Sequence, residues 1–319
     1  MDHIKSSGLF SANAKLMISG EYLVLHGAQA LSIPLKNGQK LKITEHEGNA
    51  SLVWKTYVKG KPWFEAIFSL NDFVIANTDD FPTAINLRNI LLAMRSLAPQ
   101  FLTGQMKYEA FSELDFEITL GLGSSSSLLV NMANWAKIDP FELLQKVSSG
   151  SGYDVATAMS QKPILYRITN TIPEVIPCNF YPVFHEHLYF AYLGRKRNSA
   201  LAIQEFYERT AKDFSSYIID LDIITKSMVA AVELREFRKL MHEHERIISA
   251  VIGTPPIGTK EFADFNGEIK SLGAWGGDFI LLATEMPREY VISWLRNKDL
   301  NTWFKYEDIA LMPEKPLEI

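Results

Sequence analysis

Apolar residues near the N-terminus come in short runs separated by glycine or polar residues, a pattern typical of strands joined by tight turns. This pattern predicts strands at 16–19, 22–25, 41–44, 51–58 and 63–69. Farther along, Ile85, Ile90, Leu91 and Met94 recur near helical spacing, and Pro99 follows as a stop signal. The N-terminal part is therefore predicted to be an antiparallel or mixed sheet followed by a helix at 84–97.

The middle of the chain is predicted to hold one more strand and two helices. Residues 116–120 alternate between apolar and polar positions, which predicts a strand that runs directly into a glycine- and serine-rich loop. Residues 126–136 favour a buried helix. Asp139 then begins a typical helix start, with proline at the first position and glutamate at the third, and this helix should end before Gly150.

The pattern changes after residue 166, where three prolines break the chain into extended pieces. A strand is predicted at 188–193, followed by long helices at 200–211, 216–231 and 234–251. A turn rich in glycine and proline at 253–258 leads to a further helix and to the segment 273–283. We therefore expect a second lobe that begins near 170–180.

Composition places the chain among ordinary soluble globular proteins and excludes the collagen-like, coiled-coil and disordered classes. Its 319 residues are 47% hydrophobic and 22% charged, and this length favours two lobes over a single core. The 32 Lys and Arg residues against 37 Asp and Glu give a net charge of -5, so there is no global electrostatic case for nucleic acid. A local basic pocket for an anionic substrate is compatible with this balance.

Cysteine content and the length of the apolar runs predict a cytoplasmic protein. Cys178 stands alone, which excludes an intrachain disulfide and a multi-cysteine metal site and favours a reducing compartment. The N-terminus lacks the apolar region of a signal peptide, and stretches such as 279–283 are too short to span a bilayer. We expect a small-molecule substrate, with neither nucleic acid nor membrane as a partner.

The strongest local chemistry lies in the run Gly121-Leu122-Gly123-Ser124-Ser125-Ser126-Ser127. Glycines let a ligand approach the backbone, the following helix offers unpaired N–H groups, and serine hydroxyls add donors or a ligand for Mg²⁺. Together these features predict a phosphate cradle that differs from a Walker A loop and from the dinucleotide-binding spacing. A glycine turn before a serine-rich helix N-cap explains the same residues without a ligand.

Three further groups of residues could belong to a functional site, but each taken alone is weak evidence for one. Asp154 emerges from the glycine turn at 150–153, as a base beside a transferable phosphate would, but also as a helix cap would. Three glycines within 273–277 predict either close approach of the backbone to a ligand or a tight turn. Lys15 enters an apolar strand, where it reaches a charged partner or extends to solvent.

The order of these clusters resembles the GHMP small-molecule kinases, which include the galacto-, homoserine, mevalonate and phosphomevalonate kinases. The matching segments are Lys15 with Gly20-Glu21-Tyr22, then 121–125, 152–154 and 273–277, so the resemblance covers nearly the whole chain. It implies an α+β fold with an N-terminal S5-like α/β lobe over 1–172 and a C-terminal ferredoxin-like lobe over 173–319. It further implies ATP and Mg²⁺ as cofactors, mevalonate or 5-phosphomevalonate as substrate in isoprenoid biosynthesis, and a monomer or homodimer.

The resemblance also implies a set of site residues. It assigns the ATP phosphates to Gly121, Leu122, Gly123, Ser124, Ser125, Ser126 and Ser127, catalysis to Asp154 and Lys15, and Mg²⁺ to Ser125 or Ser126. The glycine loop that closes the site comprises Gly273, Ala274, Gly276 and Gly277. The implied substrate contacts are Glu21, Tyr22, Ser151, Gly152, Arg195, Lys196 and Arg197.

The chain departs from the family pattern at several positions. The usual Pro-x-Gly-Lys opening reads Ala12-Asn13-Ala14-Lys15, and Trp275 stands where glycine is normal. The Mg²⁺-binding glutamate of the mevalonate and galactokinase branches has no counterpart except Glu142, whose capping position already explains it. Mg²⁺ would then be held by serine, phosphates and water.

The acceptor is left open between several small molecules. Residues 150–156 look more like the phosphomevalonate kinase version of the aspartate motif. A phosphorylated acceptor needs cations, and 195–197 offer an anion clamp, although three basic residues in a loop are usually a solvated surface. Homoserine or sugar acceptors, and a non-catalytic nucleotide sensor, are the alternatives.

The sequence also contains two histidine pairs. His185 and His187 would share one strand face, whereas His242 and His244 do not share a helical face. We expect both pairs to be structural or exposed rather than metal ligands.

Overall fold

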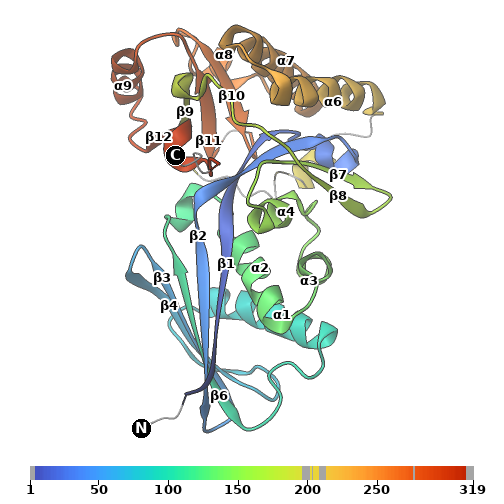
Figure 1. The fold of residues 1–319 in the computed structure, drawn as a ribbon, viewed down its shortest axis with the longest axis vertical. Coiled ribbons are helices and arrows are strands. Elements are labelled where there is room, and N and C mark those ends of the chain that lie inside the picture. The colour runs from blue at the N-terminus through green and yellow to red at the C-terminus, as the bar shows by residue number, and fades with distance from the viewer. Residues whose placement is uncertain (1–3, 196–201, 203, 208–212, 276, 314–319) are drawn as a thin grey trace, which may run out of the picture. The chain divides into compact units, whose positions relative to one another are not determined.

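The structure is a computed structural model that describes residues 4–195, 202, 204–207, 213–275 and 277–313 (Figure 1). The chain forms two compact units: unit 1 is Met1–Ala14, Asn37–Ile118 and Leu122–Met159, and unit 2 is Lys15–Lys36, Thr119–Gly121 and Ser160–Ile319. This division differs from the single boundary expected between 172 and 173. One reason is that Ala30 to Ser32 pair with Tyr166 to Ile164, so two segments that both precede residue 172 belong to unit 2.

Unit 1 is built around a mixed sheet. Its strands are β1 (Ile4–Ser19) and β2 (Ala30–Glu47), which both units share, β3 (Ser51–Val58), β4 (Lys61–Ser69), β5 (Ile75–Thr78) and β6 (Met106–Leu114). β3 pairs antiparallel with β4 and parallel with β6, and β6 pairs antiparallel with β2. Every second side chain of β3 is buried, which is the period that the alternation of its sequence predicts.

Helices cover one face of this sheet (Figure 1). They are α1 (Phe81–Leu97), α2 (Ser124–Ala136), α3 (Pro140–Val147) and α4 (Tyr153–Met159). Trp54 and Phe68 of the sheet and Leu91 and Met132 of the helices belong to one buried apolar cluster. The start of α3 is confirmed, because Asp139 Oδ1 accepts hydrogen bonds from two backbone N–H groups of the first turn.

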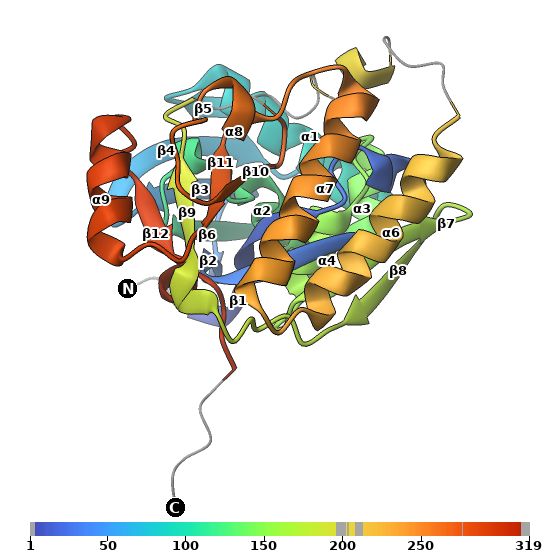
Figure 2. The same cartoon turned by 90° about the horizontal axis from the view of Figure 1, so that it is seen from above.

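Unit 2 contains a β-hairpin and an antiparallel four-stranded sheet. The hairpin is β7 (Ile164–Thr169) with β8 (Ile172–Pro177), and the sheet has the order β10 (Glu268–Leu272), β11 (Phe279–Ala283), β9 (Leu188–Tyr192) and β12 (Trp303–Lys305). Its helices are α6 (Ser215–Ala230), α7 (Leu234–Ile252), α8 (Ile257–Lys260), α9 (Arg288–Asn297) and α10 (Tyr306–Ile309). α6 and α7 lie side by side (Figures 1 and 2).

Two predicted strands, at 22–25 and 116–120, are wrong, because short 3₁₀ helices replace them in whole or in part, and a third such helix replaces the extended geometry considered for His185 and His187. Residues Leu23–His26 form one such turn, since the chain reverses there with positive φ at Gly20 and Tyr22. Ile118–Leu120 forms another, and the strand lies earlier, in β6. His185–His187 forms the third, so its two imidazoles do not share a strand face. The helix expected at 200–211 lies largely outside the described residues.

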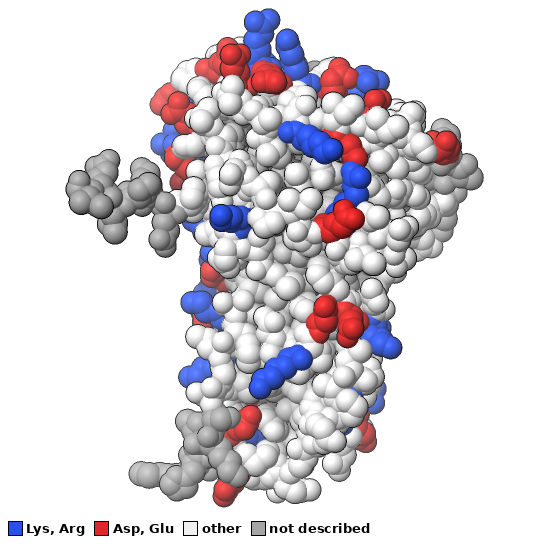
Figure 3. Space-filling model, turned by 45° about the vertical axis from the view of Figure 1, so that its right-hand side comes forward, with Lys and Arg blue, Asp and Glu red and all other residues white. Residues whose placement is uncertain are grey.

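Among the described residues, no helix combines the length and the hydropathy that a membrane crossing requires. The face drawn in Figure 3 carries charges of both signs that are interspersed in small groups.

Candidate active site

The loop from Gly121 to Ser127 connects unit 2, to which Gly121 belongs, with unit 1. Gly121 and Gly123 adopt φ values of 71° and 93°, in the left-handed region that glycine tolerates best. Gly123 is the N-cap of α2, and no side chain caps the helix there. The first N–H groups of α2 therefore lack the side-chain partner that a capped helix has, which is the local requirement for anion binding.

The serines of this loop have different environments. Ser126 and Ser127 are buried, and their hydroxyls donate to Gly123 O at 2.9 Å and to Gln39 Oε1 at 2.8 Å, respectively. Ser124 is half-buried and Ser125 is exposed. Ser125 is therefore the serine of this run whose side chain is most open to a bound phosphate or metal ion.

A buried polar network attaches α2 to the sheet of unit 1. Besides Ser127, Asn131 of the same helix face donates from Nδ2 to the backbone carbonyl of Gln39 at 2.8 Å. The amide of Gln39 in turn donates to Ser112 Oγ of β6 at 2.8 Å. All four residues are almost completely buried, so these bonds fix the position of the helix that carries the loop.

Asp278 is a residue that the predicted site lacks. A Cβ atom placed at Gly121 would lie 2.8 Å from Asp278 Oδ1, and one placed at Gly273 would lie 3.6 Å from Oδ2. The carboxylate of Asp278 therefore lies beside a glycine of the serine loop and a glycine of the C-terminal loop. The backbone of Asp278 has a φ of 55°, which is uncommon outside glycine and marks a tight turn.

The C-terminal glycine loop is partly described. Ala274 and Gly277 are buried, and Gly277 N–H donates to Ala274 O at 3.3 Å, which closes a tight turn. Gly276 lies outside the described residues. The turn that was the alternative explanation of these glycines is thus present, and Asp278 follows it directly.

Asp154 lies in the first turn of α4, a helix that packs against α2. It is half-buried, and its Oδ1 accepts from Val155 N–H at 3.0 Å. Gly152, with φ 87°, is buried just before it, and Ser151 is half-buried. Lys15 is a half-buried residue of β1 that belongs to unit 2, so its expected pairing with Asp154 stays a prediction.

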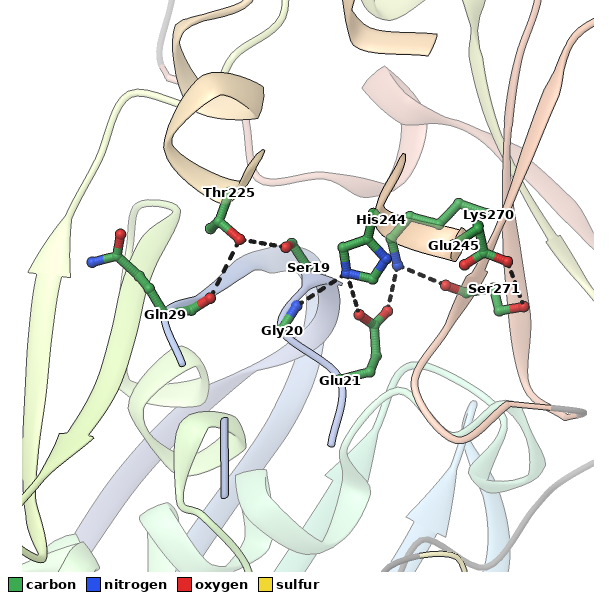
Figure 4. Close-up of polar contacts among 9 residues, drawn as sticks. All are labelled: Ser19, Gly20, Glu21, Gln29, Thr225, His244, Glu245, Lys270 and Ser271. Atoms are coloured by element: carbon green, nitrogen blue, oxygen red, sulfur yellow. Dashed lines mark hydrogen bonds and ion pairs between the residues drawn. The ribbon is translucent and has the colours of Figure 1, made fainter. Parts of the chain in front are cut away.

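Glu21 is the centre of a buried ionic cluster in unit 2 (Figure 4). Its Oε1 lies 2.5 Å from Lys270 Nζ of β10, and its Oε2 lies 2.9 Å from His244 Nε2 of α7. The Glu21, Lys270 and His244 side chains are at most 1% exposed. Lys270 also donates to Ser271 O at 2.8 Å, and Ser271 Oγ donates to Glu245 Oε2 at 3.3 Å.

Burial and the cluster's own charges set the protonation states. Burial raises the pKa of Glu21, but Lys270 and His244 lower it by more, so this carboxyl is ionised. Burial, with Lys270 adding to it, lowers the pKa of His244 to about 4, so the imidazole is neutral at pH 7. Burial raises the pKa of Glu245 to about 8, which keeps it largely protonated at pH 7. The cluster thus holds one ion pair, Glu21 with Lys270, and two groups that are largely neutral at pH 7, His244 and Glu245.

The cluster positions the turn that follows β1. Gly20 has a φ of 105°, and a Cβ there would lie 2.6 Å from Ala30, so only glycine fits. Tyr22, buried beside Phe206 with ring centroids 5.3 Å apart, follows with a φ of 61°. The substrate roles of Glu21 and Tyr22 stay predictions; both oxygens of Glu21 lie within bonding distance of protein nitrogens.

The expected anion clamp is described only at Arg195. Its guanidinium is bonded to both carboxylate oxygens of Glu261, at 3.0 and 2.8 Å. Lys196 and Arg197 lie outside the described residues.

Other predicted features are consistent with structural roles. His187 Nδ1 lies 3.1 Å from Thr284 O, and burial raises the pKa of Cys178 to about 11. Among the described residues, no group of three or more His, Cys, Asp or Glu side chains is arranged to hold a metal ion.

Local sequence carried a signal for part of the buried cluster. Phe237, Met241, His244, Glu245 and Ile248 recur at the spacing of the buried face of α7, so two ionisable residues occupy core positions of a helix. A core histidine and glutamate need polar partners. The identity of those partners, which lie far away in the sequence, has no local signal.

Solved structures of small-molecule kinases resemble this fold along their whole length. Mevalonate kinase from Methanococcus jannaschii has a TM-score of 0.69 at 16% identity, with 97% of this chain and 99% of that chain covered. L. major mevalonate kinase in complex with R-mevalonate has 0.67 at 14% identity, with 99% and 100% covered. Streptococcus pneumoniae phosphomevalonate kinase, in complex with phosphomevalonate and AMPPNP, has 0.66 at 15% identity, with 93% and 99% covered.

Sequence comparison adds nothing to this likeness, since no family profile and no curated sequence matches the chain. The structural similarity shows that the chain has the GHMP kinase fold, and the predicted α+β fold class is confirmed.

Proposed function

We propose that this protein is an ATP-dependent phosphotransferase that phosphorylates mevalonate or 5-phosphomevalonate. The observation that carries the proposal is the N-terminus of α2. It combines an uncapped helix start, two glycines with left-handed φ and an exposed serine, on a helix that a buried network holds in place. This combination suits the phosphate chain of a nucleotide better than it suits a purely structural turn.

The expected reaction is transfer of the γ-phosphoryl group of ATP to an oxygen of the acceptor. The bond from the γ-phosphorus to the β,γ-bridging oxygen breaks, a bond from that phosphorus to the acceptor oxygen forms, and ADP leaves. With an alcohol acceptor, the hydroxyl proton passes to the carboxylate of Asp154. With a phosphate acceptor no proton has to move, and cationic groups matter more.

The residues present fit Mg²⁺ that arrives with the nucleotide. Mg²⁺ keeps several waters and binds through few protein oxygens together with substrate phosphates. Ser125 supplies the exposed hydroxyl for this role, whereas the hydroxyl of Ser126 already donates to Gly123 O. Bound Mg²⁺ would neutralise charge on the transferring phosphates.

Support for the acceptor comes from the structures that resemble this fold. Those in complex with R-mevalonate and with phosphomevalonate cover nearly the whole chain, and residues 150–156 resemble the phosphomevalonate kinase motif. Lactococcus lactis galactokinase complexed with galactose has a TM-score of 0.66, which makes a sugar the principal competing acceptor.

One screen tests the proposal directly. Purified protein, ATP and Mg²⁺ are incubated with mevalonate, 5-phosphomevalonate, homoserine or galactose, and ADP is measured with a coupled assay. We expect ADP release only with mevalonate or its 5-phosphate and only with Mg²⁺. ATP binding without turnover on any of the four would favour a sensor.

Variants then assign the roles. Asp154→Asn should reduce turnover by at least about a hundredfold on an alcohol acceptor, the lower end of the range for loss of a general base. Asp139→Asn, which keeps the capping oxygen of α3, is the matched control and should leave turnover unchanged. Undiminished turnover in Asp154→Asn would remove this residue from the mechanism.

A further inference from the structure

A pocket lies wholly within unit 2, between α7, α8 and β10. Its volume is about 410 Å³, which is large enough for a small organic molecule. Its wall includes Glu245, Ser249, Thr259, Glu268 and the rings of Phe262 and Phe265. None of the residues proposed for phosphoryl transfer lines it.

One oxygen of the Glu245 acid group in this wall has no hydrogen-bond partner. Glu245 is 2% exposed, and within the described part of the chain its Oε1 accepts and donates no hydrogen bond. Ser271 supplies the other hydrogen bonds of this carboxyl, from its Oγ to Oε2 at 3.3 Å and from its backbone N–H, and the charge of Lys270 also acts on it. A buried carboxyl oxygen without a donor is costly, so it marks a position that a ligand group can complete.

The cations around the pocket are already paired with carboxylates of the protein. Arg246 bonds to Glu243 at 2.8 Å, and His242 Nδ1 lies 3.4 Å from Glu268 Oε1. Lys270, which is buried behind Glu245, is paired with Glu21. The pocket therefore presents the carboxyl of Glu245 and that of Glu268, one oxygen of which already lies near His242, and the pKa of each is raised by burial.

The apolar part of the wall is rigid. Phe262 and Phe265 both pack on Trp294, with ring centroids 5.4 and 4.7 Å apart, and all three belong to a buried apolar cluster with Ile269. A ligand that binds here is thus expected to have a hydrocarbon portion next to its polar group.

We propose that this pocket is a binding site for a small molecule that carries a primary ammonium group on a short apolar body. The ammonium has three donors, which match the free oxygen of Glu245, the carboxylate of Glu268 and a wall hydroxyl. The body contacts the two phenylalanine rings, whose faces also attract a cation.

Binding of a cation at Glu245 is coupled to release of a proton from its carboxyl group. The carboxyl ionises when the ammonium arrives, and its proton leaves to solvent, so affinity increases as the pH rises toward 8. The ionised Glu245 would then lie beside the pair of Lys270 and Glu21, which connects the pocket to the Gly20-Glu21-Tyr22 turn.

Isothermal titration of the full chain tests the site with three probes: benzylamine, its neutral isostere benzyl alcohol, and inorganic phosphate. At pH 8 we expect benzylamine to bind at least tenfold more tightly than benzyl alcohol. At pH 7, titration in buffers of different ionisation heat should report release of close to one proton. Preference for phosphate or for the alcohol, or binding without proton release, would overturn the proposal.

Variants localise the binding. Glu245→Gln keeps the shape of the protonated acid and should weaken benzylamine binding at least tenfold and abolish proton release. Ser249→Trp fills the pocket from the half-buried side of α7 and should also prevent binding, whereas Glu236→Gln, an exposed acid of the same helix, should bind as the parent chain does. Unchanged binding in both pocket variants would place benzylamine elsewhere and reject the site.

Discussion

Replacement of Lys270 by methionine would test the buried cluster most directly. Lys270→Met keeps the length of the side chain but removes the cation that lies 2.5 Å from Glu21. Glu21 would remain as a carboxylate that is 1% exposed, with the neutral His244 as its nearest partner. Loss of one partner of a buried pair costs about 3 to 5 kcal/mol, because the other charge stays desolvated.

The same reasoning predicts rescue by a second substitution. Adding Glu21→Gln to Lys270→Met removes both charges, so the double variant should regain at least about 2 kcal/mol. If the two charges did not interact, the losses in the free energy of unfolding of the two single variants would instead add in the double variant.

The pH dependence of Lys270→Met should also differ from that of the parent chain. In the parent chain the pKa of Glu21 lies below 4.5, so its contribution is present above 4.5 and is lost as the pH falls through the folded-state pKa. Without Lys270, burial dominates and moves that pKa upward, and the pKa of His244 rises too. Relative to the parent chain, Lys270→Met should therefore become more stable as the pH falls from 7.5 to 5.5.

Hydrogen exchange of the β10 amides is a suitable assay, because two compact units need not unfold in one transition. A cost of about 3 kcal/mol corresponds to roughly a hundredfold faster exchange through unfolding. Lys260→Met is the control within the same unit, since its side chain is 57% exposed and its pair with Glu261 should be worth less than about 1 kcal/mol. A cost below 1 kcal/mol for Lys270→Met, equal at both pH values, would refute the reasoning.

Three further predictions concern other parts of the chain. The pKa of Glu245 is about 8 in the folded state, above its ordinary 4.5, so the stability that its protonated form contributes is lost as the pH rises. The free energy of unfolding of unit 2 should therefore fall by about 1 to 2 kcal/mol between pH 6.5 and 8. Glu245→Gln should abolish this pH dependence, measured by hydrogen exchange of the β10 amides. Gly121→Ala and its control Gly60→Ala both place alanine at a left-handed φ, which should lower stability by about 1 kcal/mol in each case. Only the new methyl group at 121 would push on Asp278, so only Gly121→Ala should weaken ATP binding measured by calorimetry. Asn131→Leu leaves a buried carbonyl without its donor and should lower the free energy of unfolding of unit 1 by about 1 to 3 kcal/mol, measured by urea denaturation.

Sequence patterns predicted the elements whose side chains alternate or recur on one face. Residues 51–58 form β3 with the bounds that were expected, because one face of that strand is buried and the other is not. Residues 22–25 show the limit of this reasoning. Leu23 and Val24 are both buried although they are neighbours, because a tight turn carries them into the core, and a short apolar run does not distinguish a turn from a strand.

The candidate site was predictable only where its residues are close in sequence. The serine loop, the glycine turn before Asp154 and the C-terminal glycines are each local patterns, and their order carries the resemblance to a family. Glu21 and Lys270, in contrast, are 249 positions apart and meet only through the fold. Asp278 directly follows the C-terminal glycine loop in the sequence, but its position beside Gly121 needs the tertiary structure.

The serine loop itself combines two requirements that a sequence motif does not separate. Ser126 and Ser127 direct their hydroxyls into the protein, toward Gly123 and Gln39, and so hold the helix start and its attachment to the sheet. Ser125 alone of these three is exposed. Serine at 126 and 127 is thus explained by folding even if no ligand ever binds, so a run of serines overstates the number of phosphate contacts. If the loop binds ATP with Mg²⁺, the functional test therefore rests on Ser125, and substitution of Ser127 would act through the position of α2.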